Sequence, residues 1–595
     1  MRSDFKSATA LSVTAGDSSA VQDLHWLEKN IPCQAACPAG TDIPGYLEAI
    51  YHGRFAEAYA INLRDNVFPA VLGRVCSRPC EDACRHGWPG NGESVAICFS
   101  KRSAADFDHS APVVLKPNGA ATGKTVAVVG AGVAGLAVAR DLALAGHRVT
   151  VFEKHATPGG MLNQGIPAFR LPRAVIAREI EQVEATGVEI RCGVDIGGEI
   201  TLTELAGRYD AVVMAAGTLR PNVLALPGKD LRGVEHGLSF LLQVNEFGRR
   251  EVGGRVIVIG GGYTAMDCAR TALRLGAQVG VVYRRAREDM VVLPGEVEEL
   301  IEEGGHLETN CSPVGFLGAG GKVIGVRFVR TRQGEPGRDG RRLPVEVPGS
   351  QLDIGAVTVI LATGQFPQTA WIDPRLQRKL VADDGWLSSG SAQETAQANV
   401  FAAGDFALGA TTLIQAIGHA RESAGKVDAW LMGQEQPSKR AKVGAVFQTK
   451  VPGGHGTGRT PRMNVIPIHP MPILPVVARK LAVEVETGFA KDVAAEEASR
   501  CYLCHYKFEI IDEKCVLCDE CLNVKPVEGC IVEIASLIRD DEGRITDFTR
   551  VEKGKTDSLY YNRLWIDQSQ CIRCGRCESV CPVNAITIQK VSLQA

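Results

Sequence analysis

Two groups of cysteines near the C-terminus have the spacing of iron–sulfur ligands. Each group is a C-x2-C-x2-C triplet, preceded in an internal repeat by an apolar segment and an aspartate. The triplet residues are Cys515, Cys518, Cys521, Cys571, Cys574 and Cys577. Such triplets favour [4Fe–4S] clusters, whereas structural zinc, the alternative, uses four ligands in paired C-x2-C units.

Each triplet is followed by one further cysteine. Cys530 follows the first triplet, and Cys581, directly before Pro582, follows the second. This order resembles the run of two-cluster bacterial ferredoxins, in which the fourth cysteine of each motif ligates the other cluster. We therefore expect Cys581 to complete the cluster of the first triplet and Cys530 that of the second. Two features differ from the usual run. Eight residues, instead of three, separate Cys521 from Cys530, and Cys530 is not followed by proline.

A glycine-rich turn after the apolar segment VAVV indicates a second chemistry. Gly130, Gly132 and Gly135 have G-x-G-x-x-G spacing, and Glu153 follows a second strand-like segment. In such turns the glycines let a pyrophosphate approach a helix N-terminus, and the acid accepts a hydrogen bond from a ribose hydroxyl. A purely structural turn is the alternative. Strand, helix and acid together favour dinucleotide binding.

A second turn of this kind follows the segment RVIVIG. Gly260, Gly262 and Ala265 occupy the motif positions, and the next strand ends in Arg284 and Arg285 instead of an acid. Guanidinium groups suit a 2′-phosphate through charge-assisted hydrogen bonds. A solvated pair at a strand end is the alternative. The pattern favours NADP(H) over NAD(H).

Gly404 and Asp405 stand before a helix expected over TTLIQAIGHARESAG. The N-terminus of a helix supplies positive potential, which suits a ring edge that gains negative charge on reduction. In flavoproteins with two dinucleotide-binding units, such an aspartate binds the flavin ribitol.

Five segments carry a resemblance to known reductases: GGMLNQGIPAFRLP (159–172), MAAGT (214–218), VYRRAREDM (282–290), ILATGQFP (360–367) and AAGD (402–405). They resemble the small subunit of glutamate synthase and the reductase half of dihydropyrimidine dehydrogenase. The resemblance covers roughly residues 31–426 and implies FAD in the first unit and NADPH in the second. It also implies that Gly217 and Gly364, within these segments, contribute to cofactor binding.

An N-terminal group of cysteines comprises Cys33, Cys37, Cys76, Cys80 and Cys84. In the family that the chain resembles, this region holds two [4Fe–4S] clusters. The family's opening R-C-x-x-C element is missing before Cys33, but it recurs far downstream with Cys501 and Cys504. The resemblance implies that Cys33 and Cys84 share a cluster with this pair, so we expect the downstream pair to fold back and complete it.

The second N-terminal cluster would take Cys37, Cys76 and Cys80. In the family its fourth ligand falls at about Lys101, which cannot ligate as an ammonium group. Cys98, one helical turn earlier, is the nearest soft replacement. The alternative is that Cys98 is a buried small side chain and the downstream pair a structural remnant, leaving one cluster in this region.

Alternating strand-like and helical segments predict an α/β multidomain chain. We expect a helical iron–sulfur cap, two Rossmann-like domains for FAD and NADP, a Pro/Gly-rich linker and an α+β bacterial-type ferredoxin domain. In that order the expected ranges are 1–115, then 116–225 with 365–433 for FAD, 226–364 for NADP, 434–498 and 499–595.

Composition narrows the class of protein. The 595 residues carry 65 Lys and Arg against 68 Asp and Glu, so neither nucleic acid nor an anionic membrane is expected as a partner. No segment reaches the roughly 18 consecutive apolar residues of a membrane span, and residues 1–13 lack a signal-peptide core. Grouped cysteines suit a reducing compartment, so we expect a cytoplasmic protein. Cys192, Cys268 and Cys311 stand alone and are expected to be buried small side chains.

These features predict a flavin-dependent NAD(P)H oxidoreductase that exchanges electrons with a partner through [4Fe–4S] clusters. Hydride transfer to flavin needs orientation more than a side-chain acid, so no catalytic side chain is expected. No substrate domain remains, which favours one subunit of a hetero-oligomer with a catalytic subunit or ferredoxin as partner. A 2-oxoacid:ferredoxin oxidoreductase is the nearest whole-chain resemblance. The alternatives are a glutamate synthase small subunit, a ferredoxin:NADP transhydrogenase and a non-catalytic electron-wiring module.

Overall fold

The computed structural model describes residues 30–107, 115–337, 340–382, 385–388, 395–435, 440–447, 457–539, 545–551 and 563–594. The chain divides into two compact units. The first comprises Pro112–Glu435 and Pro472–Thr487, and the second comprises Arg2–Ala111, Gln436–Met471 and Gly488–Ala595. Residues 1–13, which were considered above as a targeting segment, lie outside the described residues.

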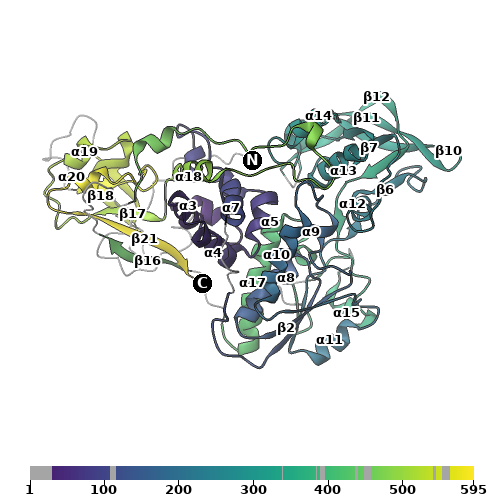
Figure 1. The fold of residues 1–595 in the computed structure, drawn as a ribbon, viewed down its shortest axis with the longest axis horizontal. Coiled ribbons are helices and arrows are strands. Elements are labelled where there is room, and N and C mark those ends of the chain that lie inside the picture. The colour runs from purple at the N-terminus through teal and green to yellow at the C-terminus, as the bar shows by residue number, and fades with distance from the viewer. Residues whose placement is uncertain are drawn as a thin grey trace. The chain divides into compact units, whose positions relative to one another are not determined.

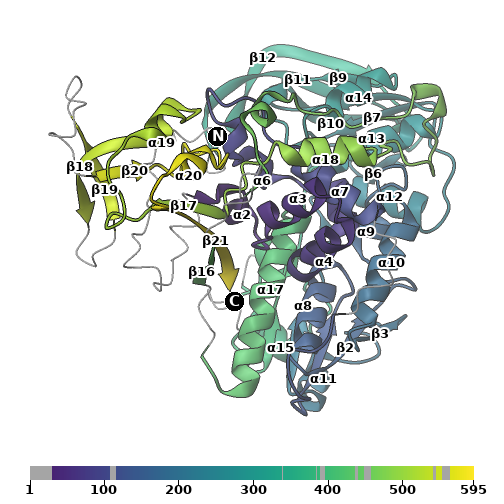
Figure 2. The same cartoon turned by 60° about the vertical axis from the view of Figure 1, so that its left-hand side comes forward.

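A five-stranded parallel sheet forms one half of the first unit. Its strands in spatial order are β15 (Val400–Ala402), β4 (Ala211–Met214), β1 (Thr125–Val129), β2 (Arg148–Glu153) and β3 (Glu189–Cys192). The strands are apolar because neighbouring helices cover the sheet. Helices α8 (Val133–Leu144) and α17 (Leu413–Met432) lie side by side in this half (Figures 1 and 2). The first glycine turn joins β1 to α8.

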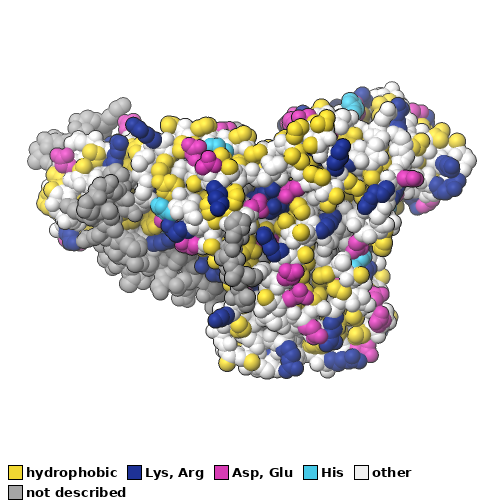
Figure 3. Space-filling model, viewed as in Figure 1, with side chains coloured by type: hydrophobic (Ala, Val, Ile, Leu, Met, Phe, Trp, Pro, Cys, Tyr) yellow, Lys and Arg dark blue, Asp and Glu magenta, His cyan; other side chains and the backbone are white. Residues whose placement is uncertain are grey.

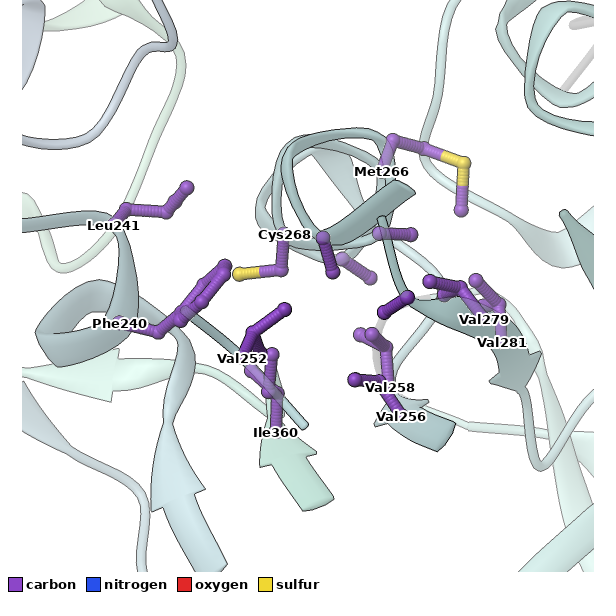
Figure 4. Close-up of a cluster of buried hydrophobic side chains, with 14 of the residues drawn as sticks. Phe240, Leu241, Val252, Val256, Val258, Met266, Cys268, Val279, Val281 and Ile360 are labelled. Carbon is purple, nitrogen blue, oxygen red and sulfur yellow. The ribbon is translucent and has the colours of Figure 1, made fainter. Parts of the chain in front are cut away.

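A second five-stranded parallel sheet repeats this arrangement in the other half. Its order is β6 (Val234–His236), β13 (Thr358–Leu361), β7 (Arg255–Ile259), β8 (Gln278–Val282) and β9 (His306–Glu308). Helices α12 (Gly237–Asn245), α13 (Tyr263–Arg274) and α14 (Glu296–Glu302) accompany it. Figure 4 shows its core, where Cys268 packs among Phe240, Val252 and Ile360.

Two short strands, β5 (Arg220–Pro221) and β14 (Gln365–Phe366), pair on the two chain connections between these sheets. An antiparallel sheet of β10 (Cys311–Ala319), β11 (Lys322–Pro336) and β12 (Arg342–Gly355) extends the second half. The remaining elements are α9 (Met161–Gln164), α10 (Arg173–Glu184), α11 (Leu202–Arg208), α15 (Pro374–Leu380), α16 (Asp405–Leu408), η3 (Arg287–Asp289) and η5 (Val476–Ala478).

The second unit begins with a group of helices. They are α2 (Pro32–Ala36), α3 (Ile43–Tyr51), α4 (Phe55–Asn66), α5 (Pro69–Val75), α6 (Pro79–Asp82), η2 (Arg85–Gly87) and α7 (Ile97–Asp106). Helices α2, α3, α5 and α6 have proline in the first turn, where no intrahelical N–H bond is lost. Helix α18 (Lys491–Ser499) packs against α3 and α7.

Two small antiparallel sheets complete the second unit. One has the order β16 (Arg440–Phe447), β21 (Ile586–Gln594) and β17 (Tyr506–Ile510), and the other β19 (Ile545–Arg550), β18 (Ile531–Arg539) and β20 (Arg563–Ile566). Short helical turns carry three of the cysteines. They are α19 (Glu520–Asn523), η6 (Glu528–Cys530) and α20 (Arg576–Val580), and a further turn, η4 (Pro461–Val465), carries none.

The predicted fold class is confirmed by the two parallel sheets and the cysteine-bearing α+β segment. The predicted domain limits remain predictions, although the range 434–498 contains more structure than a linker. Residues 472–487 pack in the first unit, and α18 crosses the expected boundary at residue 499. Cys268 and Cys311 are fully buried as expected, whereas Cys192 is half-buried.

The charge distribution on the surface and the polarity of the helices agree with the composition. On the face in Figure 3, basic and acidic side chains are interspersed among apolar ones, as a net charge of −3 would suggest. Among the described residues, none of the helices has the length and apolar character to cross a membrane.

Candidate functional site

The first glycine turn is tightly packed except at Gly132. Gly130 has φ +104°, and a Cβ there would lie 2.6 Å from the carbonyl oxygen of Ala215. A Cβ on Gly135 would lie 1.9 Å from the carbonyl oxygen of Gly130. At Gly132, by contrast, no atom lies within 4 Å of the Cβ position. The turn therefore leaves open space at the position where a pyrophosphate would approach the α8 N-terminus.

Glu153, the last residue of β2, is held against this turn. Its Oε2 accepts a 2.9 Å hydrogen bond from the N–H of Ala131, and its Oε1 accepts one of 2.8 Å from the N–H of His155. The side chain is buried. Because a carboxylate oxygen can accept more than one hydrogen bond, both oxygens retain capacity for the ribose hydroxyls of a dinucleotide.

The turn after β15 lies next to the first glycine turn. Gly404 has φ +62°, and a Cβ there would be 2.3 Å from Cβ of Ala134, in the first turn of α8. Asp405 follows, and its Oδ1 accepts a 2.5 Å hydrogen bond from Oγ1 of Thr411. Burial raises the pKa of Asp405. Helix α17 then begins with a capping box between Thr412 and Gln415. Gly132 and Asp405 therefore both lie near the N-terminus of α8. Gly217, just after β4, has a positive φ of +67°, which glycine adopts without strain.

The second glycine turn repeats the pattern of the first. A Cβ on Gly260 would lie 2.3 Å from the carbonyl oxygen of Ala362, whereas the nearest atom to the Cβ position of Gly262 is 3.9 Å away. Ala265 is fully buried. Gly364 has φ +103° and open space at its Cβ position. Both turns thus leave open space at the middle glycine, where a pyrophosphate group would lie.

The two arginines expected at the 2′-phosphate differ in their surroundings. Arg284 is exposed. Arg285 is 7% exposed, and its Nε donates a 2.9 Å hydrogen bond to the carbonyl oxygen of Arg342 in β12. The two residues lie in the bend that follows strand β8, which ends at Val282. Arg284 is therefore the better placed of the two for a phosphate, and Arg285 connects β8 to the antiparallel sheet.

The first C-terminal triplet surrounds a cavity together with the predicted fourth cysteine. Cys515, Cys518, Cys521 and Cys581 line an empty volume of about 320 Å³, together with apolar residues such as Ile510 and Leu564. Cys518 is exposed, and the N–H of Ala585 donates to Sγ of Cys581 at 3.2 Å. The structure thus brings together the four residues that the crossed ferredoxin pattern assigns to one cluster.

The other predicted ferredoxin set is also close together. Burial raises the pKa of Cys577 well above its usual value, and Cys571, Cys574, Cys521 of the first triplet and Cys530 raise it further. Burial likewise raises the pKa of Cys530 to about 12, with Cys571 as the next cause. The irregular spacing before Cys530 is accommodated by η6, which ends at this residue.

A second cavity lies in the helical part of the same unit. Cys33, Cys84, Cys501 and Cys504 line an empty volume of about 330 Å³, close to that of the C-terminal site. Burial raises the pKa of Cys33, and Cys84, Cys504 and Cys501 raise it further. The pair that lies more than 400 residues downstream therefore faces the N-terminal cysteines, as the fold-back hypothesis requires.

The last set is less complete. Cys76 and Cys80 are buried next to each other, with Cys37 and Lys101 as charged neighbours. Cys98 is buried as well, but its Sγ donates to the carbonyl oxygens of Leu72, at 3.2 Å, and Gly73, at 3.4 Å. Three cysteines thus meet near Lys101, and the thiol of Cys98 is engaged by the backbone of α5.

The donor chemistry of these sets fits an iron–sulfur group better than a single ion. Among the described residues, no group of three or more His, Cys, Asp or Glu side chains could hold one metal ion. Zinc ligands lie only about 2.0–2.3 Å from the metal. Two of the cysteine sets instead line empty volumes of about 330 and 320 Å³, which leave room for a larger group. All 19 cysteines are free of disulfides.

Sequence reasoning missed a set of buried arginines near the cysteines. Arg85 directly follows Cys84, and Arg573 lies between Cys571 and Cys574. Both are almost fully buried, as is Arg459. Their positions inside cysteine motifs were the available signal, but burial of a guanidinium group cannot be read from spacing.

Comparison with known proteins agrees with this arrangement. A family model described as pyridine nucleotide-disulphide oxidoreductase matches residues 124–424. Models for the 4Fe-4S cluster domain II of dihydropyrimidine dehydrogenase and for a 4Fe-4S binding domain match residues 27–112 and 564–587.

Three relatives cover most of the chain. The NADP(+)-dependent formate dehydrogenase subunit beta of Moorella thermoacetica is 35% identical over 80% of this chain and 70% of its own length. The NADPH-Fe(3+) oxidoreductase subunit beta of Geobacter sulfurreducens is 35% identical over 80% and 75%. The glutamate synthase [NADPH] small chain of Escherichia coli is 35% identical over 67% and 88%.

The glycine turns, the cysteine sets and these similarities all indicate the same kind of protein. The chain contains an FAD- and NADPH-binding reductase and 4Fe-4S domains, and it is an oxidoreductase that transfers electrons between NADPH and a partner. The chain belongs to the pyridine nucleotide-disulphide oxidoreductase family and is similar to the two beta subunits named above.

Proposed function

We propose that this chain is the NADP(H)-linked subunit of a cytoplasmic hetero-oligomeric oxidoreductase and that it holds FAD and four [4Fe–4S] clusters. The residues named above divide the work. The first glycine turn with Glu153 and Asp405 would hold FAD, and the second turn with Arg284 would hold NADP(H). The four cysteine sets would hold the clusters. FAD, when bound, accepts a hydride as an electron pair and can release electrons singly.

In this proposal the side chains of the protein bind and orient FAD and NADP(H), and they do not act as acids or bases. Glu153 accepts hydrogen bonds from ribose hydroxyls, and the N–H groups at the start of α8 and α13 contact pyrophosphates. Arg284 distinguishes a 2′-phosphate from a free hydroxyl. Positioning of this kind is sufficient for hydride transfer between two bound rings.

The observation that carries the proposal is the cavity formed by Cys33, Cys84, Cys501 and Cys504. Its volume is close to that of the C-terminal site, and its ligands come from both ends of the chain. This supports a continuous set of clusters in the second unit instead of a cap and a separate ferredoxin domain.

The partner is proposed as a separate catalytic subunit. Two relatives are named as beta subunits and one as a small chain, which supports a hetero-oligomer. A 2-oxoacid:ferredoxin oxidoreductase remains our candidate for the whole enzyme. A formate dehydrogenase is a second candidate, because that beta subunit matches 80% of this chain and the glutamate synthase small chain 67%.

Anaerobic mixing of the isolated chain with NADPH tests the enzymatic part of the proposal. We expect rapid loss of the flavin absorbance, and slower or no loss with NADH. Retention of oxidised flavin with both coenzymes would contradict the proposal and favour an electron-wiring module. Purification of the native complex would then identify the partner subunit.

A further inference from the structure

Three buried arginines lie among the cysteine sets without an acidic partner. Arg85, Arg459 and Arg573 are 2%, 1% and 1% exposed, and none of them forms an ion pair with a described acidic side chain. Arg500, also 1% exposed, does form one, at 2.6 Å with Glu497. A buried guanidinium without an ion-paired counter-charge is costly, and the groups close to these three that can carry negative charge include the cysteines and, for Arg573, Asp567.

The hydrogen bonds of the three arginines show which segments of the chain they hold. Arg459 donates to the carbonyl oxygen of Ile572 at 2.8 Å, and Arg573 donates to those of Gln568, at 2.7 Å, and Cys571. Both therefore hold the backbone of the loop that carries the second ferredoxin triplet. The fold-back pair lies close to the same arginine, because the Arg459 guanidinium is also 5.0 Å from the ring centre of Tyr502, between Cys501 and Cys504.

Arg85 is the one of the three that reaches a ligand sulfur. Its Nη1 donates to Sγ of Cys504 at 3.3 Å. Its Nη2 donates to the carbonyl oxygen of Ser569 and, at 3.3 Å, to that of Cys571. One guanidinium thus contacts a cysteine of the fold-back set and the backbone of a cysteine in the second ferredoxin set.

We propose that Arg85 is a positioning residue that joins these two sites and raises the reduction potential of the group held by Cys33, Cys84, Cys501 and Cys504. The proposal rests on the proposed function, since it assumes that both sets hold clusters. Hydrogen bonds to ligand sulfurs are an established means of adjusting cluster potentials. A donor that carries a positive charge stabilises the more negative, reduced state most strongly.

The step that Arg85 assists is a one-electron exchange between neighbouring sites. One site is oxidised by one electron and the other is reduced by one, and no bond forms or breaks. Arginine stays protonated at all ordinary pH values, so Arg85 neither gives nor takes a proton in this exchange. Its charge is therefore a fixed contribution to both sites.

Potentiometric titration of the anaerobically prepared full chain, followed by electron paramagnetic resonance, tests the role of Arg85. The variants are Arg85→Gln, which removes the charge, and Arg85→Lys, which keeps the charge without the planar fork. Arg500→Lys is the control, because Arg500 is equally buried and already has Glu497 as counter-charge. Iron is measured on each preparation. The fold-back signal is identified as the one lost in the double variant Cys501→Ala, Cys504→Ala.

We expect full iron in Arg85→Gln and a tenfold lower ratio of reduced to oxidised fold-back cluster at a fixed potential. This change equals a midpoint shift of about 59 mV for one electron. Arg85→Lys should shift the midpoint potential of the fold-back cluster by less, and Arg500→Lys should leave that potential unchanged. Unchanged midpoints in Arg85→Gln with full iron would overturn the proposal. Loss of about four Fe in both Arg85 variants would overturn it too, since Arg85 would then be only structural. A wild-type chain without the fold-back signal would instead contradict the proposed function.

Discussion

At the scale of single residues, the proposed chemistry depends on where the backbone leaves open space and on which side chains are exposed. The two strand-end arginines illustrate this. Their spacing predicts a phosphate site, but spacing cannot tell which of them faces the ligand. That depends on Arg342, which accepts from Arg285 and lies on a hairpin 57 residues away.

Replacement of Arg284 tests the choice of coenzyme. Loss of a charge-assisted contact costs about 1.5–3 kcal/mol, so Arg284→Ala should raise KM for NADPH at least about tenfold and leave KM for NADH nearly unchanged. Steady-state kinetics with both coenzymes measure this. In Arg285→Ala, the effect should be similar for both coenzymes. Equal effects of Arg284→Ala on NADPH and NADH would refute the assignment of the 2′-phosphate.

The open glycines allow a matched pair of variants. Gly132 and Gly262 have φ −78° and −124°, so a larger residue strains neither backbone and only fills the space. Gly132→Val should yield protein that keeps its iron and lacks FAD. Gly262→Val should keep FAD, which NADPH no longer bleaches. Absorbance spectra and iron analysis measure both outcomes, and stoichiometric FAD in Gly132→Val would mean that the first turn binds another ligand.

At the scale of elements, the segment 472–487 differs most from its sequence interpretation. Its prolines suggested a linker, yet the N–H of Val485 donates to the carbonyl oxygen of Phe169 at 2.9 Å. Arg479 forms ion pairs with Glu302, at 2.8 Å, and Glu303, at 3.2 Å, on and just after α14. Such contacts join residues far apart in the chain, which composition cannot reveal.

Glu303 is the centre of this ion-pair network. Burial alone would raise its pKa, but hydrogen bonds from Arg270 and Arg274 outweigh it and lower the pKa from 4.5 to about 2. A pKa that is lower in the folded state adds stability above the unfolded pKa, and this stability is lost as the pH falls from about 5 to 2.

Neutralisation of Glu303 should therefore destabilise the first unit. Glu303→Gln should lower the free energy of unfolding by about 3 kcal/mol at neutral pH, because three arginines lose their buried partner. Glu302→Gln is the control: this side chain is 53% exposed, and its loss should cost less than about 1 kcal/mol. Thermal release of FAD, followed by fluorescence, compares the two variants. Equal destabilisation would show that the buried network does not stabilise the unit.

The fold-back pair is tested at the same scale. Cys501 and Cys504 follow α18, whose Glu497 accepts from the N–H of Ala96 at 2.7 Å and so fixes the pair next to the N-terminal helices. The double variant Cys501→Ala, Cys504→Ala should lose about four Fe per chain and keep the signals of the ferredoxin pair. An unchanged iron content would mean that this pair ligates nothing.

At the scale of the whole chain, the repeated sequence motifs predicted the domains and the cysteine groups. The surroundings of single side chains could not be predicted from the sequence. The glycine turns and cysteine triplets are local patterns with a fixed mechanical reason, so the two parallel sheets and the cysteine grouping were predictable. The resemblance supplied the pairing of Cys33 and Cys84 with a distant element. The thiol of Cys98 and the buried Arg85 depend on contacts with distant backbone, so neither environment could be derived from spacing.

In the proposed function, one chain joins an FAD-containing NADPH reductase to four clusters. The most direct measurement is the content of iron, acid-labile sulfide and FAD in anaerobically prepared chain. The proposal divides all of the 19 cysteines except Cys192, Cys268 and Cys311 into four sets of four, with Cys98 as the proposed fourth member beside Cys37, Cys76 and Cys80. We predict about 16 Fe, about 16 sulfide and about one FAD per chain. A reproducible value near 12 Fe in fully loaded protein would contradict the fourth cluster.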